Sequence, residues 1–281
     1  MTYLLLIIIS MSMSFFVYSI CQFTKIRIPF SYGIISLGVG LLCGTILFIA
    51  YPPTTSHGES NSNVIIVGTS GDFPPFVFIE NSEIVGFDID LMHEIGKRLD
   101  KKIEIKNMPF GTLIPALQLG KIQVIAAGLT ATPQRARNVL FTNPYLEGDP
   151  LIIISRNTFP IETVGDLNGK EVIVNEGYTA DLYMSQISGP ILKRLKTVAE
   201  AFLALTSGRA IAFVTAKNAA QPFFDKQGAE GYHIAVIPGT DENSSLAVSQ
   251  KYPELLAEIQ SVLDHMKKDG FISNLRTKWG L

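Results

Sequence analysis

Two long runs without a charged residue open the chain, and they constrain its fold more than any other feature. Residues 3–21 and 28–51 contain no Asp, Glu, Lys or Arg, and Lys25 and Arg27 lie between them. About 20 apolar residues are enough to cross the roughly 30 Å hydrocarbon core of a bilayer. We therefore predict that residues 1–51 form a membrane anchor or signal segment with one or two hydrophobic spans.

The charges around these runs predict on which side of the membrane the remaining chain lies. Lys25 and Arg27 favour a cytoplasmic position for the short connection, so both ends of the chain are expected outside. The alternative is a secretory signal in which this basic pair precedes the apolar segment. Phe48 argues against cleavage after Ala50, because a small residue is needed at that position. Both versions deliver the rest of the chain across the membrane.

The composition of the remaining chain excludes several classes of function. The protein has 281 residues, a net charge of −2 and 17% charged residues, and its mean hydropathy of +0.28 reflects the two apolar runs. No basic excess remains outside them, which argues against nucleic acid as a partner. Cys21 and Cys43 both lie inside the runs, so no disulfide or thiolate metal site is expected elsewhere. The polar, Pro- and Ser-rich residues 52–63 are predicted to be a flexible linker.

From residue 64 onwards, short β-branched runs alternate with segments of helical periodicity. Strands are predicted at 64–68, 102–106, 124–127, 151–154, 171–174 and 211–214, and helices at 91–99, 113–119, 133–138, 179–187, 199–207 and 253–268. This alternation is typical of βαβ units and therefore of an α/β fold. The length suggests two lobes of about 100 residues each.

Several short motifs occur in an order that carries a family resemblance. They are VGTSGDFPPF at 67–76, VGFDIDL at 85–91, FGTLIPAL at 110–117, GLTATPQR at 128–135, FTNPY at 141–145, DLNGK at 166–170, and KKDGF and KWG near the end. Their order and spacing resemble the polar amino-acid-binding periplasmic solute-binding proteins of ABC importers (family 3, the lysine/arginine/ornithine-, histidine- and glutamine-binding type). The resemblance covers the whole of 64–281.

This resemblance implies a two-lobe periplasmic-binding-protein type II fold, preceded here by N-terminal membrane helices. Lobe 1 is expected to comprise 64–147 and 245–281, and lobe 2 to comprise 148–244, with crossing segments near 146–150 and 237–246. The implied function is the extracytoplasmic substrate-binding component of an amino-acid ABC transporter. It would close on a polar or basic amino acid and present it to the permease membrane subunits. The expected location is the periplasmic face, anchored to the inner membrane or secreted to the periplasm, and a monomer is expected.

An amino-acid ligand needs a donor fork for its carboxylate, and Arg135 is the candidate. Thr132 and Pro133 are suited to the N-cap and first position of a helix, which places Arg135 on the first turn. There its guanidinium can bind a carboxylate through two parallel bonds, beside the backbone N–H of Gly128 and the hydroxyl of Thr130. The matching Arg has this role in the proteins that the chain resembles.

Three further residues are expected to line the ligand site. Phe73 and Phe110 match the positions where the family places aromatic rings on either side of the ligand side chain. In the second lobe, Thr179 precedes a predicted helix, whose free N–H groups can complete the carboxylate site. The sequence leaves open whether Glu176 and Tyr178 face the site or solvent.

Two departures from the family pattern affect the ligand. Where relatives carry an Asp that binds the ligand ammonium, this chain has Ala216. A buried ammonium needs a counter-charge, and Glu176 is the candidate substitute. Ser70 occupies the place of an Asp that pairs with cationic side chains in the lysine/arginine type, and Asp72 lies two residues further on. Cationic specificity therefore does not follow from the resemblance.

No catalytic, metal or cofactor site is predicted. The four His residues are scattered singly, and no Ser-His-Asp or Cys-His arrangement can be assembled. Asp88 is interpreted as the N-cap or dipole partner of the helix that follows it. The chain is therefore expected not to be an enzyme. Two alternatives stay open: a carboxylate lyase or dehydratase on the same fold, with Glu176 as its acid, and a ligand-sensing module with an altered cleft.

Overall fold

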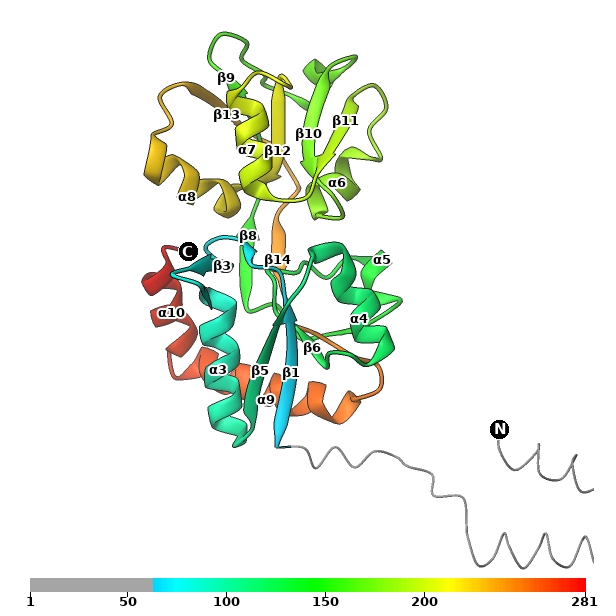
Figure 1. The fold of residues 1–281 in the computed structure, drawn as a ribbon, viewed down its shortest axis with the longest axis vertical. Helices are drawn as coiled ribbons and strands as arrows, with labels where there is room; N and C mark the ends of the chain where they lie inside the picture. The colour runs from blue at the N-terminus through cyan, green and yellow to red at the C-terminus, as the bar shows by residue number, and fades with distance from the viewer. Residues whose placement is uncertain (1–62) are drawn as a thin grey trace, which may run out of the picture. The chain divides into compact units, whose positions relative to one another are not determined.

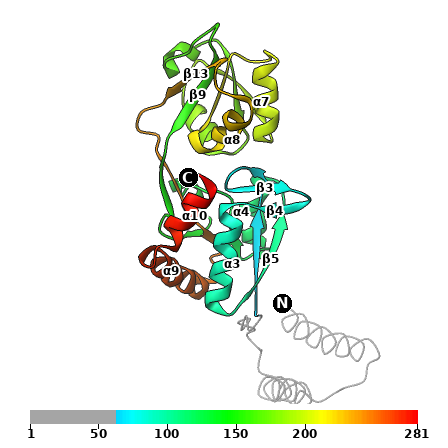
Figure 2. The same ribbon diagram turned by 90° about the vertical axis from the view of Figure 1, so that its left-hand side faces the viewer.

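The computed structural model describes residues 63–281, which form two five-stranded sheets with helices packed on them (Figures 1 and 2). The membrane segment predicted for 1–51, and the linker up to residue 62, lie outside the described residues. Among residues 63–281, every helix is too short or too polar to cross a bilayer.

The first sheet has the strand order β5-β1-β6-β15-β7. Its strands are β1 (Val64–Thr69), β5 (Lys102–Asn107), β6 (Val124–Ile125), β7 (Leu140–Phe141) and β15 (Ala247–Val248). β1 is parallel to β5 and β6, whereas β15 enters antiparallel between β6 and β7. The C-terminal part of the chain therefore completes this sheet.

Helices and a small sheet surround the first sheet, and together they form lobe 1. The helices are α3 (Phe87–Leu99), α4 (Leu113–Leu119), α5 (Pro133–Ala136), α9 (Pro253–Lys268) and α10 (Phe271–Trp279), with the 3₁₀ turn η1 (Phe110–Thr112). The small sheet consists of β2 (Asp72–Phe73), β3 (Val77–Glu80) and β4 (Glu83–Val85).

The second sheet has the strand order β11-β10-β12-β9-β13, and it forms lobe 2 with its helices. The strands are β9 (Leu151–Arg156), β10 (Glu171–Asn175), β11 (Ile191–Leu195), β12 (Ala212–Ala216) and β13 (Tyr232–Val236). The 3₁₀ turn η2 (Val164–Leu167) and the helices α6 (Thr179–Met184), α7 (Val198–Thr206) and α8 (Lys217–Gln227) complete the lobe. β10, β11 and β12 are parallel, and the buried β9 runs antiparallel to β12 and β13.

Two short strands connect the lobes and pair with each other. β8 (Leu146–Asp149) and β14 (Glu242–Ser244) form an antiparallel ladder in which Glu242 lies opposite Asp149. Figure 1 shows both strands running between the two sheets. They fall within the crossing segments predicted from the sequence. The ladder places two carboxylates side by side at the junction of the lobes.

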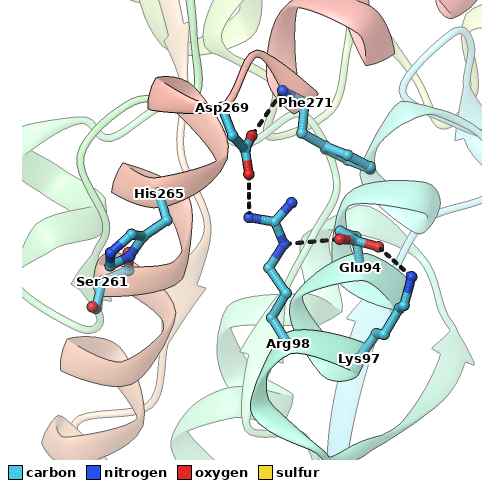
Figure 3. Close-up of polar contacts among 7 residues, drawn as sticks. All are labelled: Glu94, Lys97, Arg98, Ser261, His265, Asp269 and Phe271. Atoms are coloured by element: carbon cyan, nitrogen blue, oxygen red, sulfur yellow. Dashed lines mark hydrogen bonds and ion pairs between the residues drawn. The ribbon is translucent and has the colours of Figure 1, made fainter.

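The C-terminal helices are fixed to lobe 1 by packing and by one arginine. α9 and α10 pack against each other and against α3. Arg98 on α3 donates to Glu94 Oε1 at 2.8 Å and to Asp269 Oδ2 at 2.7 Å, at the end of α9 (Figure 3). Asp269 also accepts a bond from the backbone N–H of Phe271, whose ring lies under the guanidinium. This cluster connects α9 and α10 to α3.

Candidate functional site

A pocket with an empty volume of about 350 Å³, part of it open to solvent, is lined by both lobes. Its walls are formed by Phe73, Phe110, Ala127, Gly128 and Arg135 from lobe 1, by Asn175, Tyr178, Thr179, Ala180, Val214, Thr215 and Ala216 from lobe 2, and by Glu242 from the crossing strand β14.

Arg135 reaches this pocket from the helix start that the sequence predicts. Thr132 is the N-cap of α5, its hydroxyl accepts the backbone N–H of Arg135 at 3.2 Å, and Pro133 occupies the first turn. Arg135 lines the pocket, and only 6% of its surface remains exposed.

The Arg135 guanidinium is held from both lobes. Nη1 donates to the Thr130 carbonyl at 2.8 Å, and Nη2 donates to the Gly177 carbonyl of lobe 2 at 2.9 Å. Its cation lies 5.5 Å from the centre of the Phe110 ring. Burial lowers the pKa of Arg135 to about 10, and attraction to Glu242 opposes that shift. These two bonds use two of the five guanidinium N–H groups.

Glu242 is the acid of this pocket, and none of the sequence motifs predicts it. The residue is 8% exposed, and its carboxylate accepts a hydrogen bond from the Thr130 hydroxyl at 3.2 Å. Burial and the nearby Asp149 raise the pKa of Glu242 to about 7, whereas Arg135 and the hydroxyls of Thr130 and Thr179 lower it. A carboxyl group poised near neutrality, facing a cation across a pocket, is a candidate partner for a positively charged ligand group.

Asn175 adds a second acceptor to the same pocket. The residue ends β10 and is almost fully buried. Its Nδ2 donates a long bond of 3.4 Å to the Leu195 carbonyl, but its Oδ1 has no hydrogen-bond partner among the described residues. A buried acceptor without a partner is costly, so a ligand donor would stabilise this side chain.

The backbone N–H of Gly128 is not the free donor that the sequence analysis expects. It donates to Asp88 Oδ2 at 2.6 Å, and Tyr145 donates its hydroxyl to the other oxygen of Asp88 at 2.6 Å. Of the two roles expected for Asp88, the N-cap is wrong because Gly86 is the N-cap of α3, but Asp88 does lie in the first turn of that helix. Asp88 is fully buried, and burial raises its pKa to about 6. It fixes the loop that leads to Arg135.

Gly128 itself remains important to the shape of the pocket. Its φ angle is +57°, and a Cβ atom there would lie 2.6 Å from the Phe73 ring. Only glycine therefore allows this loop to pass so close to Phe73. Thr130, the other expected carboxylate donor, uses its hydroxyl on Glu242.

The aromatic end of the pocket differs from the sequence expectation. Phe73 and Phe110 line the pocket, but the ring of Tyr178 lies against both of them. Ring centres are 5.3 Å apart for Phe73 and Tyr178 and 4.3 Å apart for Phe110 and Tyr178. The question that the sequence leaves open for Tyr178 is thereby answered: the ring faces the site and is 7% exposed.

Ser70 and Asp72 lie beside this aromatic end and are bonded to each other. The Ser70 hydroxyl donates to Asp72 Oδ1, and the Tyr178 hydroxyl lies 3.4 Å from the same oxygen. Burial raises the pKa of Asp72, and the bonds from Ser70 and Tyr178 oppose this. Neither Ser70 nor Asp72 is among the residues that line the pocket.

The remaining predicted residues separate into two groups. Thr179 lines the pocket and interacts with Glu242, and Ala216 forms part of the wall. Glu176 is exposed and does not line the pocket, so the structure contradicts its nomination as the substitute acid. Within residues 63–281, no group of three or more His, Cys, Asp and Glu side chains is arranged to hold a metal ion.

Comparison with known proteins identifies the family. Residues 65–281 match the model of bacterial extracellular solute-binding proteins, family 3. The chain belongs to this family. The prediction made from the sequence motifs is therefore confirmed, and so is the two-lobe α/β fold that it implies.

Individual family 3 proteins show how far the likeness extends. The chain is 31% identical over 232 residues to ABC transporter arginine-binding protein 1 of Escherichia coli (strain K12), covering 80% of this chain and 93% of that protein. It is 28% identical to the arginine-binding extracellular protein ArtP of Bacillus subtilis (strain 168), covering 84% and 94%. A solved structure of an ancestral arginine-binding protein bound to arginine is 38% identical, with a TM-score of 0.73, covering 77% and 98%.

These family 3 relatives bear on the question of catalysis. They are named as binding proteins of ABC transporters, which supports the prediction that the chain is not an enzyme. The enzyme alternative depends on Glu176, which is exposed. Glu242 has the raised pKa that such an acid would need, but none of the relatives named above supports a reaction.

Proposed function

We propose that this chain is the extracytoplasmic substrate-binding component of an amino-acid ABC importer. The observation that carries the proposal is that Arg135 and Glu242, buried and oppositely charged, face one pocket at the junction of the lobes. Arg135 donates to carbonyls and Glu242 accepts from a hydroxyl, so the two charges attract each other without a direct bond. An α-amino acid, which carries a carboxylate and an ammonium, complements this pair.

In this proposal the ligand carboxylate binds N–H groups of Arg135 that are not bonded to Thr130 or Gly177, and it accepts the backbone N–H of Thr179, whose hydroxyl bonds to Glu242. The planar guanidinium matches a carboxylate through two parallel bonds. The ammonium binds Glu242 and the unpartnered Oδ1 of Asn175, which together replace the Asp that is missing at Ala216. Glu242 thus takes the role for which the sequence analysis nominates Glu176.

Ligand binding would then favour the closed arrangement of the lobes. Arg135 belongs to lobe 1, whereas Asn175 and Thr179 belong to lobe 2, so a ligand held by all three connects the lobes. A ligand that contacts both lobes stabilises the closed form relative to the open form. β8 and β14 are the proposed hinge, with lobe 1 comprising 64–147 and 245–281 and lobe 2 comprising 148–244.

The binding domain would act beside a membrane transporter. We infer that the closed form is presented to ABC permease subunits at the periplasmic face. Residues 1–51 would attach the binding domain to the inner membrane or direct it to the periplasm, and the protein would act as a monomer. The names of the arginine-binding relatives support an amino acid as the ligand class.

A thermal-shift screen of the full chain against the twenty amino acids tests this function. A ligand at 100 times its dissociation constant stabilises the folded state by about 2.7 kcal/mol, so at least one amino acid should raise the melting temperature measurably. The shift should disappear in Arg135→Ala and persist in the control Arg137→Ala, which changes an exposed arginine two positions along. A folded wild-type chain that responds to no amino acid would overturn the proposal.

A further inference from the structure

Tyr178 fills the aromatic end of the pocket from within the protein. It precedes α6 of lobe 2, and its ring packs edge-to-face on Phe73 and at a tilt on Phe110, both from lobe 1. With 7% of its surface exposed, the phenol is almost completely enclosed. The space that a ligand side chain would need between Phe73 and Phe110 is therefore occupied by a protein side chain.

The polar end of Tyr178 is also accommodated. Burial raises its pKa well above the ordinary value, so the hydroxyl keeps its proton and can donate. The acceptor is Asp72 Oδ1 at 3.4 Å, which also receives the Ser70 hydroxyl. A cationic ligand side chain entering this region would have to displace the phenol and compete with both hydroxyls for Asp72.

The remaining walls of the pocket leave little room for a side chain. The charged groups that would bind the amino-acid backbone are Arg135 and Glu242. Apart from the aromatic rings, the apolar side chains that line the pocket are the short ones of Ala127, Ala180, Val214 and Ala216. Small wall residues create space for the ligand backbone, but they offer no extended apolar surface. The one extended aromatic surface is the one that Tyr178 covers.

We propose that Tyr178 is the specificity-determining residue of this site and restricts the ligand to amino acids with small side chains, such as glycine, alanine and serine. This inference rests on the proposed function, because it assumes that Arg135 and Glu242 bind the amino-acid backbone. It narrows the polar or basic ligand expected from the sequence to one that leaves Tyr178 in place.

Moving Tyr178 aside would be unfavourable for two reasons. Its ring and the facing surfaces of Phe73 and Phe110 would lose their mutual contact, and aromatic pairs contribute beyond simple burial. Asp72, which is partly buried, would also lose one of its two hydroxyl donors. A large ligand side chain would have to replace both sets of contacts, whereas a small ligand disturbs neither.

Calorimetric titration of the full chain tests this restriction. Glycine, L-alanine and L-serine represent small side chains, and L-arginine, L-lysine and L-glutamine represent large ones. In the wild type, the best small ligand should bind about tenfold or more tightly than the best large ligand, a discrimination that pocket shape can supply. Tyr178→Ser should reduce or reverse this preference by improving the large ligands.

Two control variants separate the ring from other effects. Tyr178→Phe keeps the ring but loses the bond to Asp72, so it should retain a reduced preference for small ligands. Tyr183→Ser changes a tyrosine on α6, the helix that Tyr178 precedes. Tyr183 does not line the pocket, so the variant should leave the ranking unchanged. If Tyr178→Ser does not fold, the wild-type ranking and the Tyr178→Phe result still test the inference.

The possible failures are distinguishable. If wild-type protein binds L-arginine, L-lysine or L-glutamine as tightly as the small ligands, or if Tyr178→Ser leaves the ranking unchanged, the role of Tyr178 is overturned while the proposed function stands. If neither wild-type nor variant protein binds any amino acid although both are folded, the proposed function fails, and the inference fails with it.

Discussion

The two ends of the pocket differ in whether their buried polar groups have hydrogen-bond partners within the protein. At the aromatic end, the hydroxyls of Ser70 and Tyr178 both donate to Asp72, and the rings of Tyr178, Phe73 and Phe110 cover one another. At the charged end, Arg135 retains unused donors and Asn175 retains an unused acceptor. The aromatic end is therefore complete without a ligand, whereas the charged end is not.

This difference indicates where binding energy is available. A group that already has its protein partners gains little from a ligand, because one hydrogen bond replaces another. Buried groups with unsatisfied bonding capacity gain more. We therefore expect ligand affinity to depend mainly on Arg135 and Glu242, and ligand selection to depend mainly on Tyr178.

The largest expected effect is the loss of ligand affinity in Arg135→Ala. The variant removes the proposed carboxylate partner and leaves Glu242 without its cation. Truncating one member of a buried charge pair costs about 2–5 kcal/mol, so affinity should fall roughly 100-fold by calorimetry. The exposed-site variant Arg137→Ala should bind normally. An Arg135→Ala protein with nearly wild-type affinity would show that the carboxylate is bound elsewhere.

Glu242→Gln should have a smaller effect on affinity and an opposite effect on stability. Loss of the proposed ammonium partner should weaken binding roughly tenfold to 100-fold. Stability of the ligand-free protein at about pH 8 should increase, because the variant removes a buried charge that Asp149 repels. Chemical denaturation and calorimetry together measure the two effects, with the exposed Glu147→Gln as control. A decrease in both ligand affinity and stability would contradict the view that the Glu242 charge destabilises the ligand-free protein and serves to bind the ligand.

The titration of Glu242 predicts that both the stability of the protein and its ligand affinity depend on pH. The pKa of a glutamate side chain is ordinarily 4.5, whereas the pKa of Glu242 in the folded protein is about 7. The folded protein therefore binds this proton more tightly than the unfolded chain does. The resulting stability is present below about pH 4.5 and is lost as the pH rises to about 7. Asp149, with a pKa raised to about 6 by burial, acts in the same direction.

Ligand binding should show the reverse dependence, because the ammonium requires ionised Glu242. Affinity should decrease by up to about tenfold per pH unit as the pH falls below about 7. Calorimetry between about pH 5.5 and about pH 8 measures this slope. In Glu242→Gln the dependence should become shallow, and a wild-type affinity independent of pH would count against this role of Glu242.

The smallest expected effect comes from Arg98, which does not line the pocket. Arg98→Ala removes the contacts to Glu94 and Asp269 that connect α3 with the last two helices (Figure 3). Because these ion pairs are partly exposed, the free energy of unfolding should fall by only about 1 kcal/mol, as measured by denaturant titration. Ligand affinity should not change, and a tenfold change would mean that α3 and the pocket are coupled.

Those parts of the site that depend on local signals are predictable from the sequence. Arg135 is found because Thr132 and Pro133 specify a helix start three residues before it, and the structure has this cap. The strands and helices with strong periodicity, such as β1, β5 and α9, are found for the same reason. In each case the relevant interactions lie within one turn or one strand.

The parts that depend on distant segments are not predictable in this way. Glu242 and Glu176 are both acids in polar surroundings, and only the pairing of β14 with β8 buries the first and leaves the second exposed. The bond between Gly128 and Asp88 similarly joins segments far apart in the chain. α8 is missed because Pro222 lies inside it, where proline normally disfavours a helix.

The central claim is that Arg135 and Glu242 bind the two charged groups of one amino acid. The direct test is calorimetry with the tightest-binding amino acid, its amide, which lacks the carboxylate, and its N-acetyl derivative, which lacks the ammonium. In the wild type both derivatives should bind far more weakly. The penalty for the amide should largely disappear in Arg135→Ala, and the penalty for the N-acetyl derivative should largely disappear in Glu242→Gln. Penalties that remain unchanged in both variants would contradict the account.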